Sequence, residues 1–216
     1  MKRLVLTAII LSFMAQGMKS QDAEITPLLG YALHADLRFM EGRMELQDKA
    51  NVGINFSFPT YNASGRVEFL ISNSFAQGKW IESDDYANLM STTSFNMMVS
   101  YFQASWVWET EIQDELFYFL GGGLGLMNYS IATSDARNVL RVSGNMQTGL
   151  KYYFNNGLGF RAQGQLVLPV FMGNGTHFRG ITDSTGVNSY LTVNSTTFPV
   201  NFLLNVGIFF RIRNYR

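Results

Sequence analysis

Hydrophobic and polar residues alternate with a period of two along most of the chain. From Leu29 to Phe39 every odd position is apolar, whereas the even positions include His34, Asp36 and Arg38. Because successive side chains of an extended chain point to opposite faces, one face of this segment is apolar and the other is polar. Seven further segments repeat the pattern, at residues 51–58, 66–75, 95–108, 116–126, 140–152, 158–168 and 200–212. The sequence therefore predicts eight amphipathic β-strands.

Two of these segments depart from simple alternation. In the segment 95–108 the apolar positions are odd up to Tyr101 and even from Phe102 onward, which predicts a β-bulge near Tyr101. In the segment 116–126 the positions on the polar face include Gly121, Gly123 and Gly125. We expect this face to be kept small because backbone or large neighbouring side chains crowd it.

The composition of the two faces indicates which one meets water. A soluble sandwich or a lipocalin-like barrel would turn the apolar face inward, whereas a membrane barrel turns it outward. The polar face is mostly Gly, Ser, Asn and Gln, where a surface facing water would be rich in Lys and Glu. The apolar face has aromatic residues near the strand ends, as in the girdles of membrane barrels; they are Tyr31, Phe39, Phe56, Phe58, Trp106, Trp108, Tyr152, Phe160 and Phe210. We therefore predict an all-β, eight-stranded antiparallel up-and-down transmembrane β-barrel.

The connections alternate between long and short, as they do in outer-membrane barrels. Both termini then fall on the periplasmic side with the short turns, and closure pairs the first strand with the last. Gly157 follows Asn156 in the tightest turn, a pair that favours positive φ. The predicted extracellular loops are 41–49, 77–92, 128–138 and 172–197, and the periplasmic turns are 59–64, 110–114 and 155–157.

The polar face of an eight-stranded barrel encloses a space just wide enough for its own side chains. We therefore expect a hydrogen-bonded plug rather than a pore. Within it, Glu68 is the one acid expected in the half near the short turns, so it should pair with Arg66, Lys151, Arg161 or Arg211. The predicted plug consists of His34, Asp36, Arg38, Arg66, Glu68, Arg141, Lys151, Arg161 and Arg211, with Gln103, Gln147, Gln163 and Asn205 as neutral members.

The first twenty residues have the features of a secretory signal peptide. Lys2 and Arg3 precede an apolar run from Leu4 to Ala15, and the following residues up to Gln21 are small or polar. The run is shorter than the roughly 20 residues of a membrane-spanning helix, so a retained anchor is the less favoured alternative. We predict cleavage between residues 15 and 21, which leaves a barrel domain over 21–216.

The composition limits the ligands and cofactors that the protein can bind. The 216 residues contain 16 basic and 16 acidic side chains, and removal of the predicted signal leaves 13 and 16. This balance provides no field that would attract nucleic acid. The absence of cysteine excludes disulfides, thiol catalysis and Cys-ligated metals, and two histidines offer little to a metal centre. We expect no metal and no cofactor.

Catalytic residues are equally scarce. His34 and Asp36 share a face, but no exposed nucleophile lies beside them, so both are predicted to belong to the plug. Asp84 and Asp85 lie in a predicted loop and are expected to be solvated. The glycine-rich run from Gly121 lies within a strand and lacks the Lys-Ser/Thr of a phosphate-binding loop. We predict no catalytic residue and no enzyme.

Several short segments resemble the small eight-stranded outer-membrane β-barrel proteins of Gram-negative bacteria, particularly those of the Bacteroidota type. The resemblance extends over essentially the whole mature chain and implies a place in the cell envelope, in contact with outer-membrane lipid. It rests on Ile25-Thr26-Pro27, Gly30-Tyr31, Val52-Gly53-Ile54, Glu68-Phe69-Leu70-Ile71-Ser72, the run Gly121 to Gly125, and Gly149-Leu150-Lys151-Tyr152-Tyr153-Phe154.

Three functions are compatible with this reading. The first is a structural or interaction role through the extracellular loops, including service as an accessory subunit of an envelope complex. Its candidate contact residues are Trp80, Tyr86, His177 and Phe178. The second is a narrow porin-like channel, which requires a continuous wet path through the plug. The third, least favoured, is a lipid A-modifying enzyme.

Overall fold

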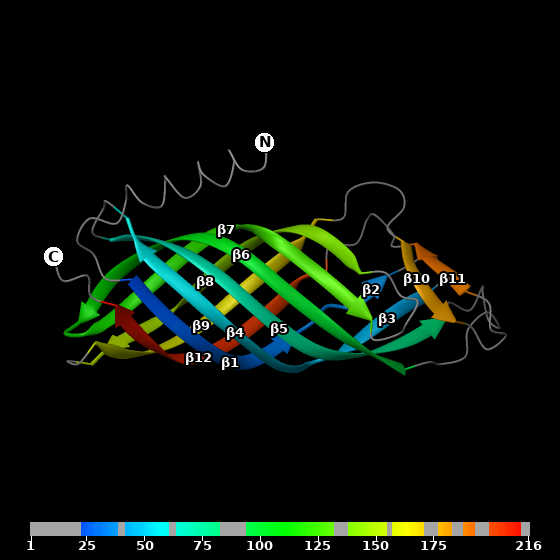
Figure 1. Cartoon of the computed structure of the whole chain (residues 1–216), viewed down its shortest axis with the longest axis horizontal. Coiled ribbons are helices and arrows are strands. Elements are labelled where there is room, and N and C mark those ends of the chain that lie inside the picture. Colours follow the sequence, from blue (N-terminus) through cyan, green and yellow to red (C-terminus); the bar gives the residue numbers. More distant parts are fainter. Residues whose placement is uncertain are drawn as a thin grey trace.

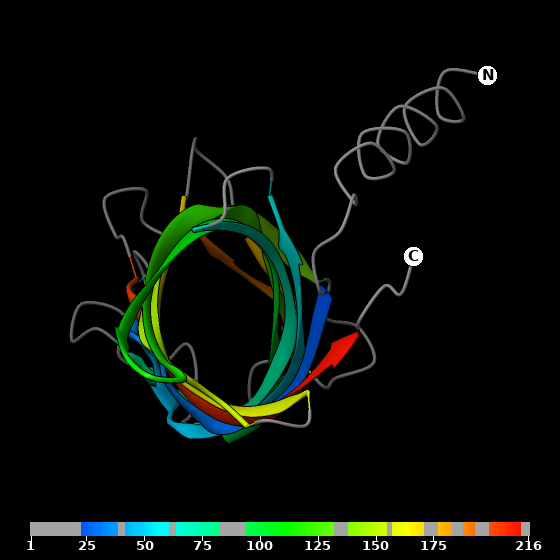
Figure 2. The ribbon, with the colours of Figure 1, turned by 90° about the vertical axis from the view of Figure 1, so that its left-hand side faces the viewer.

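The fold is a closed antiparallel β-barrel. A computed structural model describes residues 23–38, 42–60, 64–82, 94–131, 138–154, 157–170, 177–182, 188–192 and 199–212. Within these residues eight long strands form the wall, in the order β5, β4, β1, β12, β9, β8, β7, β6, and pairing of β5 with β6 closes the ring (Figures 1 and 2). They are β1 (Ala23–Leu33), β4 (Lys49–Pro59), β5 (Gly65–Glu82), β6 (Ser94–Gln113), β7 (Leu116–Ile131), β8 (Val139–Tyr153), β9 (Leu158–Pro169) and β12 (Asn201–Ile212).

The first and last strands are neighbours, as predicted. Leu29 of β1 pairs with Val206 of β12, and the register runs from Ala23 opposite Ile212 to Leu33 opposite Phe202. We call the end where β1 begins and β12 ends the turn end, and the opposite end the loop end (Figure 1). The predicted signal segment lies outside the described residues. In the described part of the chain no helix combines the length and apolarity needed to cross a membrane.

The apolar face of each strand points outward. On β12, Leu204 and Val206 are each 48% exposed, whereas the alternate residues Leu203 and Asn205 are almost completely buried. A protein in water hides such side chains, but in lipid the outer wall is the apolar one. This alternation confirms the predicted orientation of the strands.

The predicted bulge near Tyr101 is wrong. β6 pairs without interruption through this region, with Tyr101 opposite Met127 on β7 and Ser72 on β5. Met97, Val99 and Tyr101 point inward and are buried, so the apolar odd positions belong to the interior. The irregularity lies nearer the turn, between Glu111 and Gln113.

Strands replace much of the predicted loops at the loop end. β2 (Leu37–Arg38) pairs with β3 (Gly42–Gln47), and β3 pairs with the distal part of β5, where a loop over 41–49 was expected. Met44 and Leu46 of β3 are buried, which explains why the segment is extended. A separate hairpin of β10 (His177–Thr182) and β11 (Asn188–Thr192) lies at the same end (Figure 1).

The short turns lie at the turn end. Gly157 has a φ of 81°, in agreement with the Asn-Gly prediction, although residues 155 and 156 are outside the described part. β6 continues to Gln113, so the turn predicted at 110–114 is centred instead on Asp114 and Glu115, and Glu115 has a φ of 66°.

Outward aromatic residues gather mainly at the turn end. Two predicted members of the aromatic girdle do not belong to this group. Tyr31 is exposed on another part of the wall, and Phe39 lies outside the described residues. Aromatic rings at this position mark a membrane interface. The exposed members near the turns include Trp106, Trp108, Tyr118, Tyr152, Phe154, Phe160 and Phe210.

Candidate functional site: the barrel interior and its loop end

The half of the interior nearest the turn end contains six charged side chains, which we call the charged cluster. Strand alternation points them all into the barrel, and each side chain is at most 11% exposed. Three carboxylates face three cations, so the buried charges balance. The charged cluster consists of Glu24, Arg66, Glu68, Glu109, Lys151 and Arg161.

Glu68 is the best-paired carboxylate of the charged cluster. Arg161 donates from Nη1 to Oε1 at 2.6 Å and from Nη2 to Oε2 at 2.7 Å, a bidentate geometry that favours strong pairing. Gln147 Nε2 donates to the same carboxylate at 2.9 Å, and Lys151 Nζ lies 3.5 Å away. The predicted pairing of Glu68 with an interior base is therefore confirmed.

Lys151 joins the three carboxylates. Its Nζ donates to Glu24 Oε2 at 2.9 Å and also contacts Glu109, while Arg66 lies 3.4 Å from Glu24. Tyr153 Oη donates to Glu24 Oε1 at 2.9 Å. These bonds connect the side chains of the charged cluster to one another.

A layer of amides and hydroxyls follows toward the middle of the barrel. Asn145 Nδ2 donates to Gln103 Oε1 at 2.9 Å, and Gln103 Nε2 donates to Ser143 Oγ at 2.9 Å. Over Gly30 of β1, which pairs with both residues, Asn51 Nδ2 donates to Asn205 Oδ1 at 2.7 Å. This layer is neutral and buried, and hydrogen bonds connect some of its members, whereas neither amide atom of Gln165 has a partner among the described residues.

The interior of the loop end is apolar. Side chains from several strands pack there, and most of them have no solvent exposure. These side chains form one apolar cluster inside the barrel. The cluster consists of Ala32, Leu37, Met44, Leu46, Met97, Val99, Tyr101, Met127, Tyr129, Val139, Val167 and Leu203.

The predicted plug residues divide into separate groups. Arg66, Glu68, Lys151 and Arg161 lie together in the charged cluster. Arg211 lies beside it, with its guanidinium carbon 4.3 Å from the centroid of the Tyr153 ring. The structure therefore brings together the five predicted plug residues that lie near the turn end.

The remaining predicted members lie at the loop end. Arg141 is partly exposed and donates to the carbonyl of Leu140 at 3.1 Å. Asp36 is exposed, because the chain leaves the wall after β1, so its assignment to the plug is wrong. The side chain of Arg38 is outside the described part.

His34 is buried at the end of β1. Its backbone nitrogen donates to Asp48 Oδ1 at 2.9 Å, and among the described residues neither ring nitrogen has a hydrogen-bond partner. Burial lowers the pKa of His34 to about 4, although the Asp48 carboxylate acts in the opposite direction. The ring is therefore neutral at pH 7.

Sequence reasoning missed two acids of the charged cluster. The expectation of a single acid near the turns is wrong, because Glu24 and Glu109 also point inward. Glu24 lies on the even face shared with His34, but the predicted strand began only at Leu29. Glu109 continues the inward odd face of β6, which the expected bulge had obscured.

The four loop contact candidates are less completely placed. Trp80 lies on β5 opposite Met44, and His177 and Phe178 lie on β10 opposite Thr192 and Leu191. The structure describes the backbone of these three residues. Tyr86 lies outside the described residues.

Comparisons with solved structures identify the same architecture. The chain is similar to outer membrane protein OprG from Pseudomonas aeruginosa, with a TM-score of 0.57, 10% identity, and coverage of 92% of this chain and 99% of that chain. Neisserial surface protein A matches with a TM-score of 0.51 and 11% identity, over 88% of this chain and 97% of that chain. Outer membrane protein AlkL matches with a TM-score of 0.50 and 13% identity, over 93% of this chain and 94% of that chain. No protein-family model and no curated protein matches the chain.

The chain has the fold of the small bacterial outer-membrane β-barrels. Its outward apolar wall fits a lipid bilayer. The neighbours OprG and AlkL are outer-membrane proteins.

Proposed function

We propose that this chain is a non-conducting outer-membrane barrel with a structural or interaction role at its loop end. The closed interior carries the proposal. The charged cluster, the amide layer and the apolar cluster follow one another along the axis, and the bidentate Glu68–Arg161 pair lies within the first. A wet path would have to cross all three layers.

The length of the strands supports an interaction role. A tilted strand needs about 9–11 residues to cross a membrane, whereas β5 has 18, β6 has 20 and β7 has 16. The additional residues lie largely at the loop end, where β3 pairs with β5. Paired strands hold surface residues more rigidly than free loops do, and this favours recognition of a partner.

Planar-bilayer recording tests the closed interior. The reconstituted full chain should give no steady conductance above that of the bare bilayer. As a control, an open porin reconstituted in the same way shows that the assay detects a conducting lumen. Steady single-channel conductance from the unmodified chain would overturn the proposal in favour of a narrow channel.

Crosslinking in whole outer membranes tests the interaction role, including that of accessory subunit in an envelope complex. A photoreactive residue would replace exposed Arg43 on β3 at the loop end or, as the matched control, exposed Glu111 on β6 at the turn end. We expect a discrete crosslinked partner from position 43 and none from position 111. Equal products from both positions would contradict a role for the loop end.

We also propose that the chain is not an enzyme. His34 is buried while Asp36 is exposed, an arrangement that does not support a catalytic pair. Lipid A analysed by mass spectrometry should be identical in cells with and without the protein, and a changed acylation pattern would refute this. The affiliation with Bacteroidota barrels stays a prediction from the residues.

A further inference from the structure

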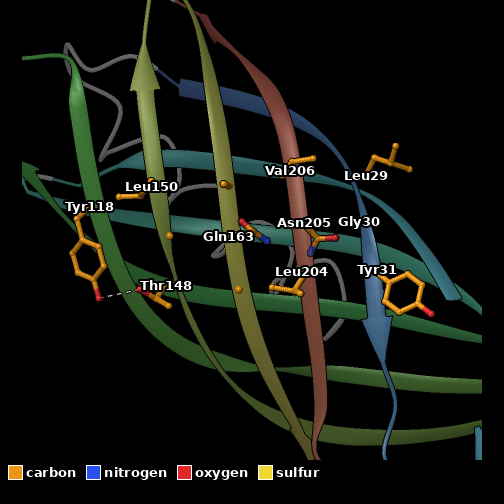
Figure 3. Close-up of a pocket in the computed structure, with 13 residues that line it drawn as sticks. Leu29, Gly30, Tyr31, Tyr118, Thr148, Leu150, Gln163, Leu204, Asn205 and Val206 are labelled. Atoms are coloured by element: carbon orange, nitrogen blue, oxygen red, sulfur yellow. Dashed lines mark hydrogen bonds between the residues drawn. The ribbon is translucent and has the colours of Figure 1, made fainter. Parts of the chain in front are cut away.

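A groove with a volume of about 670 Å³ lies on the membrane-facing wall, over β7, β8, β9, β12 and β1 (Figure 3). Its floor is formed by three small outward residues, Thr148, Ala162 and Gly164. Larger outward residues border the floor, including Leu204 on β12 and Tyr118 on β7. The groove is thus a depression bordered by bulky apolar side chains.

Strand register explains why the groove forms here. Gly164 pairs with Thr148 on one side and Leu204 on the other, and Ala162 pairs with Leu150 and Val206. Paired residues point to the same face of a sheet. The small residues are therefore adjacent on β8 and β9, and the large neighbours on both sides form the rims.

The lining of the groove is uncharged and mainly apolar. Thr148 Oγ1 lies 2.9 Å from Tyr118 Oη, to which it donates, and 3.1 Å from the carbonyl of Phe119, so its hydroxyl is used within the wall (Figure 3). None of the described residues that line the groove is charged. A headgroup or a charged peptide would find no counter-charge there, whereas a hydrocarbon chain needs none.

The position of the groove indicates a leaflet. Tyr152 and Phe160, which form a pair, belong to the aromatic group at the turn end, and Leu150 and Ala162 form the next outward pair along the same two strands. Aromatic groups of this kind mark the interface. The floor therefore begins just inside the bilayer from the turn end, on the side of the short, periplasmic turns, where the leaflet consists of phospholipid.

We propose that this groove binds one acyl chain of a periplasmic-leaflet phospholipid. An unfilled depression would leave its lining without van der Waals partners, and an acyl chain supplies them. A second copy of the barrel is a poorer occupant, because thirteen residues line the groove and a stable protein interface uses roughly 20–30 residues a side.

Native mass spectrometry of the full chain tests the proposal. The barrel would be purified in mild detergent and mixed with phosphatidylethanolamine and lipopolysaccharide. We expect one retained phospholipid per barrel, with occupancy reduced at least tenfold in Gly164→Leu, which fills the floor. A Cβ at Gly164 would meet the Phe202 ring at 3.3 Å, a contact that a side chain can relieve.

Gly144→Leu is the matched control, because a Cβ at Gly144 meets nothing within 4 Å, and its occupancy should be unchanged. Ala162→Leu replaces Gly164→Leu if that variant does not fold, as judged by its heat-dependent mobility on gels. Four results would overturn the proposal. The first three are no retained phospholipid, equal loss in the filled and control variants, and retention of lipopolysaccharide in place of phospholipid. The fourth is a wild-type dimer that the filled variant abolishes, which would assign the groove to a second copy.

Discussion

At the scale of single residues, burial determines how much an ion pair contributes to the stability of the barrel. Glu68 is 1% exposed and bonded to Arg161, whereas Glu45 forms its 2.8 Å ion pair with Arg43 at the surface, where both side chains are at least 36% exposed. Removing one partner of a buried pair leaves the other charge without compensation, while an exposed pair contributes little. The two glutamates therefore provide a direct comparison.

Glu68→Ala should lower the free energy of unfolding by about 3 kcal/mol or more, because Arg161 would remain buried without the carboxylate that it binds. Urea unfolding in detergent micelles measures this. Glu45→Ala should change the same quantity by less than about 1 kcal/mol. Similar losses in the two variants would show that the charged cluster does not stabilise the barrel.

His34 predicts a pH dependence. Its pKa of about 4 in the fold lies below the value of about 6.5 in an unfolded chain, so between these values the unfolded state binds more protons. The free energy of unfolding should therefore fall by up to about 3 kcal/mol as the pH decreases from about 6.5 to 4. Above about pH 6.5 the contribution of His34 should not change with pH. His34→Leu should lack this part of the decrease; parallel curves for the two proteins would contradict the assignment.

At the scale of elements, the glycines of β7 let two strands approach closely. A Cβ at Gly123 would lie 1.9 Å from the carbonyl oxygen of Ala104 on β6, a contact that backbone cannot relieve without moving. The sequence predicted a crowded face at these positions, and the geometry at Gly123 agrees. A small inner face on β7 is thus a requirement of packing.

Gly123→Ala should destabilise the barrel by roughly 1–3 kcal/mol through this overlap. Gly144→Ala on β8 is the control, because its added Cβ meets nothing within 4 Å, so its effect should be much smaller. Thermal unfolding in phospholipid vesicles compares them. A Gly123→Ala barrel as stable as the control would show that the strands can separate without cost.

At the scale of the whole molecule, the period-two pattern predicted strand number, orientation and closure. It did so because each strand between lipid and lumen must alternate, as Leu204 and Asn205 do. The pattern failed where the interior is itself apolar, since inward Val99 and Tyr101 look like wall residues in sequence. The interior changes from polar to apolar along the barrel axis, and the alternation of apolar and polar positions in the sequence does not show where this change occurs.

The interior partners were predictable only in part. Glu68 was identified as a paired acid because it stands on the polar face among basic residues. The basic residue that Glu68 binds is determined by the shift in register between neighbouring strands around the barrel. This shift brings Glu68 close to Arg161, which lies 93 positions further along the chain. Glu24 and Glu109 were missed because the limits and register of their strands were misjudged.

Spin-label accessibility along β12 tests the central claim most directly. The chain contains no cysteine, so Leu203→Cys, Leu204→Cys, Asn205→Cys and Val206→Cys each give a single labelling site. In phospholipid bilayers, labels at 204 and 206 should collide readily with dissolved oxygen, which concentrates in acyl chains, whereas labels at 203 and 205 should be protected. The opposite alternation, or equal accessibility at all four positions, would contradict a barrel with an apolar wall in lipid and a packed interior.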